Sequence, residues 1–419
     1  MTFPLHIAID GRLFGGKSGG IEQVVIGLVD ALSQLPDGDE RFSVLAYPMS
    51  HEWLKPYARG RCEMVLTTAV KPAPIWKRVL KKSSKLVEMG QQAGGSLARG
   101  SVTLSKSDGT IERLGAEVVH FPIQRAFFTD VPSIYHPHDL LHRHLPELLS
   151  RRERVKRDVM LGSFCKAARV VSVTSSWVKR DVTAQFDIAP EKIAVVPLTG
   201  SLGAYPTPSP AELEAARAKF GLPEAFAFYP AQTWRHKNHL MLLEAIARLR
   251  DSRGLVVPLA CSGHQNEFFP AIQQRIAELH LKEQVKFLGF VSPVELRAMY
   301  QLCRCVVIPT LFEAASGPLN EAFMAGTAAA CSNVTSLPEQ AADAALVFDP
   351  HDPAKIAEAI ARLWNDSALR TELARRGRER VMRWTWTRAA RHFRAIYRQI
   401  GGRGVTADDE AILREKPDI

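Results

Sequence analysis

Short apolar runs alternate with longer amphipathic segments along the first half of the chain. The run "LHIAID" (5–10) predicts a buried strand, and "GIEQVVIGLVDALSQL" (20–35) predicts a helix because its apolar residues recur at i, i+3, i+4 and i+7. The same pattern predicts further strands at "RFSVLAYP" (41–48), "AEVVHFP" (116–122), "VPSIYHPHD" (131–139), "ARVVSVTSS" (168–176) and "KIAVVPL" (192–198). Alternation of this kind is typical of a parallel sheet covered by helices on both faces.

A connector rich in Gly, Pro and Ser interrupts the alternation at 199–224, as is typical of a boundary between domains. After it the pattern predicts strands at "FAFYPA" (226–231), "VVPLACSG" (256–263), "VKFLGF" (285–290), "CVVIPT" (305–310) and "TAAACS" (327–332). Helices between them include residues 238–250 and 293–303. The sequence therefore predicts an α/β protein with two Rossmann-like doubly wound domains, residues 1–200 and 201–385.

Three segments fall outside this pattern. Residues 71–115 contain a basic stretch and the polar run "QQAGGSLARGSVTLSKSDGT", which indicates an insertion in the first domain. A helix predicted at 386–401 has an apolar and aromatic face, and it packs either on the second domain or back on the first. The polar residues that follow it, to 419, are expected to form a mobile tail.

Composition agrees with a folded protein of two domains, because 419 residues exceed what one hydrophobic core usually holds. No stretch approaches the ~18 consecutive apolar residues of a membrane helix. The start, "MTFPLHIAID", lacks the features of a signal peptide, so we expect a cytoplasmic protein. The six cysteines are scattered without metal-site or redox spacing, so we expect reduced thiols, mostly in the core.

The formal net charge of +10 favours an anionic partner. Residues 76–86, "WKRVLKKSSKL", mix basic and apolar side chains at roughly helical spacing. They predict either a helix on an anionic membrane surface, which would place the protein at the inner membrane face, or a solvated helix face. No zinc-finger spacing or RNA-binding motif appears, so we expect no nucleic-acid partner.

The stretch "LFEAASGPLNEAFMAG" (311–326) sets two carboxylates, Glu313 and Glu321, eight positions apart around the predicted start of a helix at Pro318. The backbone N–H groups of 316–319 and the helix dipole predict a phosphate site there. Acids beside phosphate are useful only if they accept hydrogen bonds from neutral hydroxyls, which a nucleotide sugar would supply. Otherwise Glu321 merely complements the helix dipole and Glu313 is a solvated loop residue.

The phosphate interpretation also requires cations. "PAQTWRHKNH" (230–239) places Arg235 and Lys237 directly after the first predicted strand of the second domain. Arginine offers a fork for phosphate oxygens and lysine a point charge. A solvated helix start is the alternative, but two separate loops at strand ends now indicate the same anionic ligand.

These motifs resemble the retaining glycosyltransferases of the GT-B class, group 1 or family 4 type. In the second half, the Glu313-(x7)-Glu321 stretch and "VKFLGFV", "AGTAAACSNVTSLPE" and "ALVFDPHDPAKIAEAI" match that family in order. In the first half, "GGIEQVVIGLVDAL", "VVHFP" and "HDLLHRHLPE" resemble it too. The resemblance implies two domains that face each other across a cleft, a first domain that binds the acceptor and a second that binds a nucleotide-sugar donor.

The resemblance also implies roles for single residues. Glu321 would accept the ribose hydroxyls of the donor, Glu313 would contact the transferred sugar, and Lys237 would neutralise the phosphates. His138, which ends a predicted strand, would be the active-site histidine that faces the donor sugar. The other donor-binding residues it implies are Gly19, Gly20, Arg235, Gly289, Ala315, Ser316 and Gly317. Phosphate stabilisation of this kind replaces a metal, so neither a metal site nor a cofactor is expected.

The chain departs from the family pattern at two places. Ala231 and Gln232 stand where the family commonly has Gly-Arg, so we expect Arg235 to replace the missing phosphate-binding arginine. Glu313-Ala314-Ala315-Ser316 stands where Glu-Gly-Phe-Gly is usual. Both changes leave the identity of the donor open.

The resemblance implies an enzyme that moves a sugar such as mannose from a nucleotide diphosphate to a saccharide or lipid-linked acceptor, in the synthesis of cell-envelope polysaccharide or lipopolysaccharide. Three other functions stay open: a nucleotide-sugar epimerase or a phosphorylase with the same architecture, an inactive family member that acts as a binding or scaffolding subunit, and nucleic-acid binding, which rests on charge alone.

Overall fold

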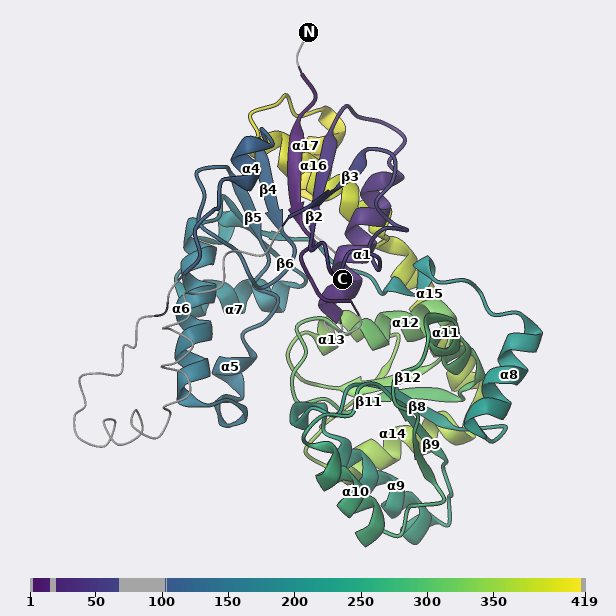
Figure 1. The fold of residues 1–419 in the computed structure, drawn as a ribbon. Coiled ribbons are helices and arrows are strands. Elements are labelled where there is room, and N and C mark those ends of the chain that lie inside the picture. Colours follow the sequence, from purple (N-terminus) through teal and green to yellow (C-terminus); the bar gives the residue numbers. More distant parts are fainter. Residues whose placement is uncertain (1–2, 16–19, 68–101, 103, 416–419) are drawn as a thin grey trace, which may run out of the picture.

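The computed structural model describes residues 3–15, 20–67, 102 and 104–415, and it contains two parallel sheets (Figure 1). Among the described residues, the first sheet has seven strands in the order β3-β2-β1-β4-β5-β6-β7, and the second has six in the order β10-β9-β8-β11-β12-β13. The strand order reverses between β1 and β4 and again between β8 and β11. In sheets of this type, ligands bind outside the carboxyl ends of the strands at these switch points.

The first sheet and its helices comprise β1 (His6–Asp10), α1 (Gly20–Ser33), β2 (Arg41–Ala46), β3 (Cys62–Leu66), α4 (Thr110–Arg113), β4 (Val118–Phe121), β5 (Ser133–Tyr135), α5 (Leu141–His144), α6 (Arg151–Ala167), β6 (Val170–Val173), α7 (Ser176–Phe186) and β7 (Ile193–Val195). Every strand pair in this sheet is parallel. A short 3-10 turn, η3 (Ser201–Ala204), then leads into the second domain.

The second half comprises α8 (Pro210–Phe220), β8 (Ala227–Pro230), η4 (Arg235–Lys237), α9 (His239–Arg253), β9 (Leu259–Ser262), α10 (Phe269–Glu278), β10 (Val285–Phe287), α11 (Pro293–Leu302), β11 (Cys305–Ile308), α12 (Gly317–Ala325), β12 (Ala329–Ser332), α13 (Leu337–Ala341), β13 (Leu346–Phe348), α14 (Pro353–Asn365) and α15 (Ser367–Arg383). Its strand pairs are parallel as well. Two doubly wound α/β domains are therefore present, as the sequence predicts. The domain limits at 200 and 385 stay a prediction.

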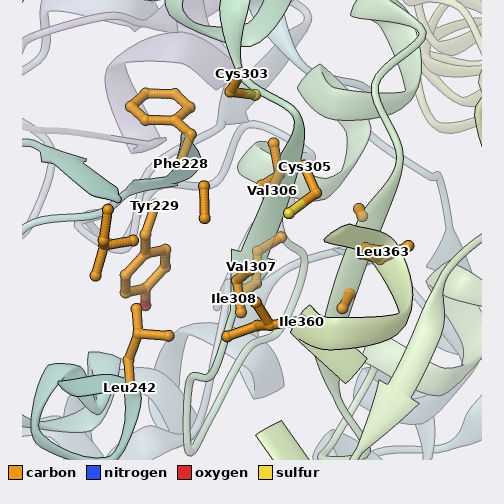
Figure 2. Packing of buried hydrophobic residues seen from close by; sticks show 14 of the residues in the cluster. Phe228, Tyr229, Leu242, Cys303, Cys305, Val306, Val307, Ile308, Ile360 and Leu363 are labelled. Atoms are coloured by element: carbon orange, nitrogen blue, oxygen red, sulfur yellow. The ribbon is translucent and has the colours of Figure 1, made fainter. Parts of the chain in front are cut away.

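Strand β11 forms the centre of the second core. All four of its residues are buried, as the continuous apolar run "CVVI" predicts for a strand covered on both faces. Figure 2 shows Val307 and Ile308 on this strand, between Tyr229 of β8 and Ile360 of α14. Full burial of an aliphatic side chain contributes about 1.5–3 kcal/mol, so this packing holds the loops at the end of β11 firmly.

Helix starts follow local capping signals. Ser150, Ser209, Ser292 and Thr406 each accept a hydrogen bond from the backbone N–H three residues later, and the acidic residue at that position bonds back to the cap. This reciprocal pair satisfies two backbone donors that a helix start otherwise leaves unpaired. The helices predicted at 238–250 and 293–303 correspond to α9 and α11.

Helix α16 (Trp386–Ile400) packs on the first domain, although it follows the whole of the second domain in sequence. Phe393 and Tyr397 are fully buried in the same cluster as Ile7, Ile9 and Val118. Figure 1 shows the yellow helices α16 and α17 beside the purple strands near the start of the chain. Of the two placements considered for this helix, the structure has the one on the first domain.

The prediction of a mobile polar tail after residue 401 is wrong for residues 407–414, which form helix α17 (Ala407–Arg414). Asp409 is 2% exposed and pairs with Arg398 of α16 at 2.8 Å, and Arg398 also pairs with Glu40 at 2.6 Å. Ion pairs among three segments of the chain therefore hold this helix in place. The sequence does not predict the helix, because its buried face consists of charged residues that are buried only as pairs.

Part of the predicted insertion 71–115 is ordered. Helix α4 lies within it, and Ile111 is 1% exposed in the first-domain core. Residues 68–101 lie outside the described part, and with them the basic stretch 76–86.

All six cysteines are buried free thiols, which confirms the expectation of reduced thiols in the core. Among the helices of the described part, none combines the length and apolar character needed to cross a membrane.

Candidate functional site

Lys237 and Glu313 meet at the switch point of the second sheet. Lys237 ends the η4 turn after β8, and Glu313 lies in the loop after the neighbouring strand β11. Lys237 Nζ lies 2.5 Å from Glu313 Oε1, and the two side chains are only 20% and 12% exposed. Because β8 and β11 are adjacent, residues 76 positions apart in sequence form an ion pair at one edge of the sheet.

Backbone contacts lock these two loops together. The Leu311 N–H donates to the His236 carbonyl at 2.8 Å. Asn238, in the left-handed region with φ 60°, donates from Nδ2 to the carbonyls of Pro309 and Pro350 at 2.9 Å each. Asparagine tolerates this conformation better than most residues, so "RHKNH" forms a tight turn that holds Lys237 in place.

The Glu313 backbone is held by the loop after β12. Its N–H donates to Thr335 Oγ1 at 3.0 Å, and its carbonyl accepts from the hydroxyls of Thr335 and Ser336 at 2.5 and 2.9 Å. Sequence reasoning missed these two hydroxyl residues as supports. They lie in "AGTAAACSNVTSLPE", a stretch that resembles the glycosyltransferase family named above. That resemblance is the sequence signal that could have indicated them.

Glu321 lies in the second turn of α12 and is only 8% exposed. Its Oε2 accepts a hydrogen bond from the hydroxyl of Tyr300 at 2.7 Å, and burial raises the pKa of this carboxyl above its usual value. A Cβ added at Gly200 would lie 2.7 Å from Glu321 Cγ, so the linker packs directly on this side chain. Tyr300 was missed because it reads as one more apolar position of α11.

The helix start at Ser316 is less open than the sequence suggests. The sequence predicts free N–H groups at 316–319, but the Ser316 N–H donates to Gln340 Oε1 at 2.9 Å and the Leu319 N–H donates to Ser316 Oγ at 3.3 Å. Pro318 has no N–H. The expectation is therefore wrong for most of the turn. The Gly317 position stays accessible, because a Cβ added there would meet nothing within 4 Å.

Arg235 is exposed on the η4 turn, two residues before Lys237. Gln232, which stands at the family's arginine position, accepts a hydrogen bond from Trp234 Nε1 at 2.8 Å. Gly289 has φ 68° with open space around its Cβ position, and its carbonyl accepts from the Gly263 N–H at 2.8 Å. The substitution of Arg235 for the missing arginine and the role of Gly289 stay predictions.

His138 follows β5 in the first domain and has the left-handed φ of 60°. Its Nε2 lies 2.8 Å from the Pro122 carbonyl, which can only accept, so Nε2 carries the hydrogen and Nδ1 keeps a lone pair. Burial lowers the pKa of His138, which keeps it neutral near pH 7. Gly20 begins α1 with open space around its Cβ position, and Gly19 lies outside the described residues.

Direct contacts join the two domains next to these loops. Thr174 Oγ1 donates to the Ala314 carbonyl at 3.1 Å, and the Phe312 ring lies 5.4 Å from His144 and 5.9 Å from Trp177. A small cavity between the domains is lined by residues that include Thr174, Leu198, Thr199, Ala315 and Asn320. The Glu313 loop therefore touches the first domain in this structure.

A carboxylate from the second domain closes the N-terminus of a first-domain helix. Glu339 of α13 accepts from the N–H groups of Ser176 and Trp177 at 2.6 and 2.9 Å. Both donors are in the first turn of α7, where backbone N–H groups have no partner within the helix.

Across the residues that the structure describes, no group of three or more His, Cys, Asp or Glu side chains is arranged to hold a metal ion.

Two family models match the chain in order. The model of glycosyl transferases group 1 matches residues 212–380, and the model of glycosyltransferase family 4 matches residues 97–198. The first match contains Lys237, Glu313 and Glu321, and the second contains His138. The chain belongs to the group 1 glycosyltransferases of family 4 type.

Curated relatives of this family member align over about half of its sequence. It is 28% identical over 221 residues to O-antigen chain mannosyltransferase B of Escherichia coli, covering 52% of this chain and 58% of the relative. It is 26% identical over 239 residues to D-inositol 3-phosphate glycosyltransferase of Corynebacterium efficiens, covering 55% of this chain and 56% of the relative. The aligned part thus spans little more than half the length of these two relatives.

Solved structures of GT-B glycosyltransferases share the whole fold. HepE of Anabaena in complex with UDP and glucose superposes with a TM-score of 0.67 at 16% identity, covering 94% of this chain and 100% of HepE. WaaG, a glycosyltransferase involved in lipopolysaccharide biosynthesis, superposes with a TM-score of 0.62 at 16% identity, covering 94% of this chain and 100% of WaaG. At such identity the likeness shows the fold alone, which confirms the predicted GT-B class.

Proposed function

We propose that this group 1 family member is a hexosyltransferase that moves a sugar from a nucleotide-diphosphate donor to a saccharide or lipid-linked acceptor, with retention at the anomeric carbon. The observation that carries the proposal is the Lys237–Glu313 ion pair at the switch point between β8 and β11, on a chain of this family. A cation and a carboxylate held together there match a ligand that has phosphates beside sugar hydroxyls.

The proposed role of each site residue agrees with its contacts in the structure. Lys237 neutralises the phosphates, and Glu313, released from Lys237 when the phosphates bind, accepts hydrogen bonds from the sugar. Glu321, oriented by Tyr300, accepts the ribose hydroxyls. His138 accepts a hydrogen bond from a sugar hydroxyl through its Nδ1, because its Nε2–H is already donated to Pro122. Arg235, Gly289 and Gly317 complete the donor site.

We assign Glu313 to positioning and electrostatic support. In a front-face reaction, the bond from the anomeric carbon to the phosphate breaks while the acceptor oxygen bonds on the same face, and the leaving phosphate takes the acceptor's proton. Charge on that phosphate is stabilised by Lys237, so the reaction is proposed to need no metal and no cofactor. Closure of the cleft excludes water, which would otherwise hydrolyse the donor.

The relatives supply the candidate substrates. O-antigen chain mannosyltransferase B favours mannose as the transferred sugar and a polysaccharide acceptor, whereas HepE was solved with UDP and glucose. The synthesis of cell-envelope polysaccharide on the cytoplasmic side of the inner membrane fits these relatives. An inactive family member that acts as a binding or scaffolding subunit is the second candidate, because Gln232 occupies the arginine position and is bound to Trp234.

A thermal-shift screen tests the proposal. Purified protein is heated with UDP, GDP, dTDP, ADP and their common sugars, and the screen is repeated with Glu321→Ala and Lys237→Ala. A ligand at 100 times its Kd stabilises the native state by about 2.7 kcal/mol, which raises Tm measurably. We expect one nucleotide to raise Tm in the wild type and in neither variant.

The matched control is Lys355→Ala, which removes an exposed lysine paired with Glu358 on α14 and should keep the shift. The proposal fails if no nucleotide or nucleotide sugar moves the Tm of the folded wild type. Transfer of labelled sugar to an acceptor then separates the enzyme from the scaffold, because a scaffold binds the nucleotide without turnover.

A further inference from the structure

A chain of three buried side chains leads from α16 to the neighbourhood of His138. The hydroxyl of Tyr397 lies 2.6 Å from His120 Nδ1, and His120 Nε2 lies 2.7 Å from His136 Nε2. Tyr397 and His120 are 0% exposed and His136 is 2% exposed. The three residues come from α16, from β4 and from the position directly after β5, so separate elements build the chain.

Both histidines of this chain are neutral near pH 7. Burial lowers the pKa of His120 to about 3, and it lowers the pKa of His136 well below its usual value. Each neutral imidazole carries one hydrogen, on Nδ1 or on Nε2. The short contact between the two Nε2 atoms is therefore a hydrogen bond in which only one of them carries a hydrogen.

Tyr397 decides which nitrogen that is. Among the described residues, His120 is the hydrogen-bond partner of its hydroxyl, and a buried donor left unpaired costs about 1–3 kcal/mol. The hydroxyl therefore donates to His120 Nδ1, which puts the hydrogen of His120 on Nε2. This Nε2–H donates to His136 Nε2, and the hydrogen of His136 is consequently on Nδ1. Without the hydroxyl, His120 Nδ1 has no partner in either arrangement of the two rings, so this selection between them is lost.

His136 lies next to His138 both in sequence and in space. The two rings lie 5.6 Å apart between centroids, and only Pro137, with its fixed φ, separates the residues in sequence. The ring of Phe393 lies 5.5 Å from His136 on the α16 side. A turn of the His136 ring would thus shift His138, and a misplacement of about 1 Å in an active site can cost about 100-fold in rate.

We propose that Tyr397 is a positioning residue for the transfer reaction: through His120 and His136, its hydroxyl sets the tautomer and ring orientation that hold His138 in place. This inference rests on the proposed function for its effect on rate, whereas the tautomer of His136 does not depend on any activity. A residue from the part of the chain that follows the second domain thereby completes the site of the first.

Tyr397→Phe tests this, because it keeps the ring packed on Phe393 and removes only the hydroxyl. In full-length protein with ¹⁵N-labelled histidine, long-range ¹H–¹⁵N spectra report which nitrogen of His136 carries the hydrogen. We expect Nδ1–H in the wild type and a mixture of both tautomers in the variant. We also expect kcat to fall about tenfold with the donor KM nearly unchanged, within the range for a displaced catalytic group.

Ser43→Ala is the matched control. It removes another buried hydroxyl of the same sheet, which lies 2.8 Å from His6 Nε2. This pair is at the other end of the strands from His120. It should lower stability without changing the His136 tautomer or kcat. His120→Asn breaks the chain in the middle, and its loss of kcat should not add to that of Tyr397→Phe, because both remove one interaction unit.

Three results overturn the inference: an unchanged His136 tautomer in Tyr397→Phe, an unchanged kcat, or a fall in kcat as large in Ser43→Ala. A wild type that transfers no sugar from any donor refutes the proposed function instead. In that case the spectra alone test whether the Tyr397 hydroxyl acts through His120 and His136. The two observations are then the tautomer of His136 and a displaced resonance of His138.

Discussion

At the scale of single residues, Glu321 combines burial with a proposed binding role. Its carboxylate has one hydrogen-bond partner in the described structure, the Tyr300 hydroxyl, and it lies beneath the linker at Gly200. Such a group is unfavourable for folding, and under the proposed function the hydroxyls of the donor complete its hydrogen bonds. Ligand sites often keep residues that the fold alone would not select.

This burial gives Glu321→Gln an expected effect on stability. Because the pKa of Glu321 is raised in the folded state, its contribution is present below its unfolded value of 4.5 and is lost as pH rises through the folded pKa. The variant keeps an acceptor for Tyr300 but has no proton to lose. The free energy of unfolding of the wild type should therefore fall relative to the variant as pH rises above 4.5, by up to about 1.4 kcal/mol for each pH unit until the folded pKa is passed.

Urea unfolding at a series of pH values measures this difference. Glu358→Gln, at an exposed position on α14, serves as the control and should follow the wild type. Parallel curves for the wild type and Glu321→Gln would show that Glu321 is not desolvated as described.

The sequence revealed those residues whose chemistry is local. Glu313 and Glu321 could be proposed because both lie in one loop and helix start, and Lys237 because it lies in the loop after a strand. Tyr300, Thr335 and Ser336 were not, because they reach their partners only when α11 and the loop after β12 pack against α12 and β11. Tertiary contacts of this kind leave no spacing pattern in the chain.

At the scale of elements, Glu339 links α13 to the N-terminus of α7 and holds the domains together. Glu339→Gln keeps the size of the side chain but removes its negative charge and one acceptor. The interaction of an anion with a helix N-terminus contributes about 0.3–2 kcal/mol, so the ligand-free protein should open more often. Small-angle scattering should show a larger radius of gyration than in the wild type.

Glu278→Gln removes an exposed carboxylate on α10 and should leave the scattering curve unchanged. Equal radii for Glu339→Gln and the wild type would mean that the aromatic contacts of Phe312 suffice to hold the cleft closed.

Elements were predictable where apolar periodicity is strong. The strands around β1 and β11 and helix α1 follow from their patterns. Helix α17 escaped prediction because its buried face is formed by Asp409 in an ion pair, and the position of α16 could not be chosen because its apolar face fits either domain. Periodicity identifies a buried face but not the surface that covers it.

At the scale of the whole molecule, buried neutral histidines make the fold sensitive to acid. Burial lowers the pKa of His6, His120, His136, His138, His142, His236, His239 and His392. Below pH 6.5 these histidines bind protons in the unfolded chain but stay neutral in the folded protein. The free energy of unfolding therefore falls as pH falls. Each such group contributes a slope of up to about 1.4 kcal/mol per pH unit.

Urea unfolding between pH 7.5 and pH 5 should therefore show a steep loss of stability. His392→Phe, which replaces a buried histidine whose pKa is lowered to about 4, should reduce the slope. A slope that stays the same in this variant would mean that His392 is solvated in the folded state.

The placement of α16 also bears on how the polypeptide folds during its synthesis. Phe393 and Tyr397 complete a core whose strands leave the ribosome long before them. The nascent first domain therefore lacks part of its interior while the second domain, whose core residues are contiguous, is being made and can fold as a unit. In this protein the half that is translated first is the half that matures last.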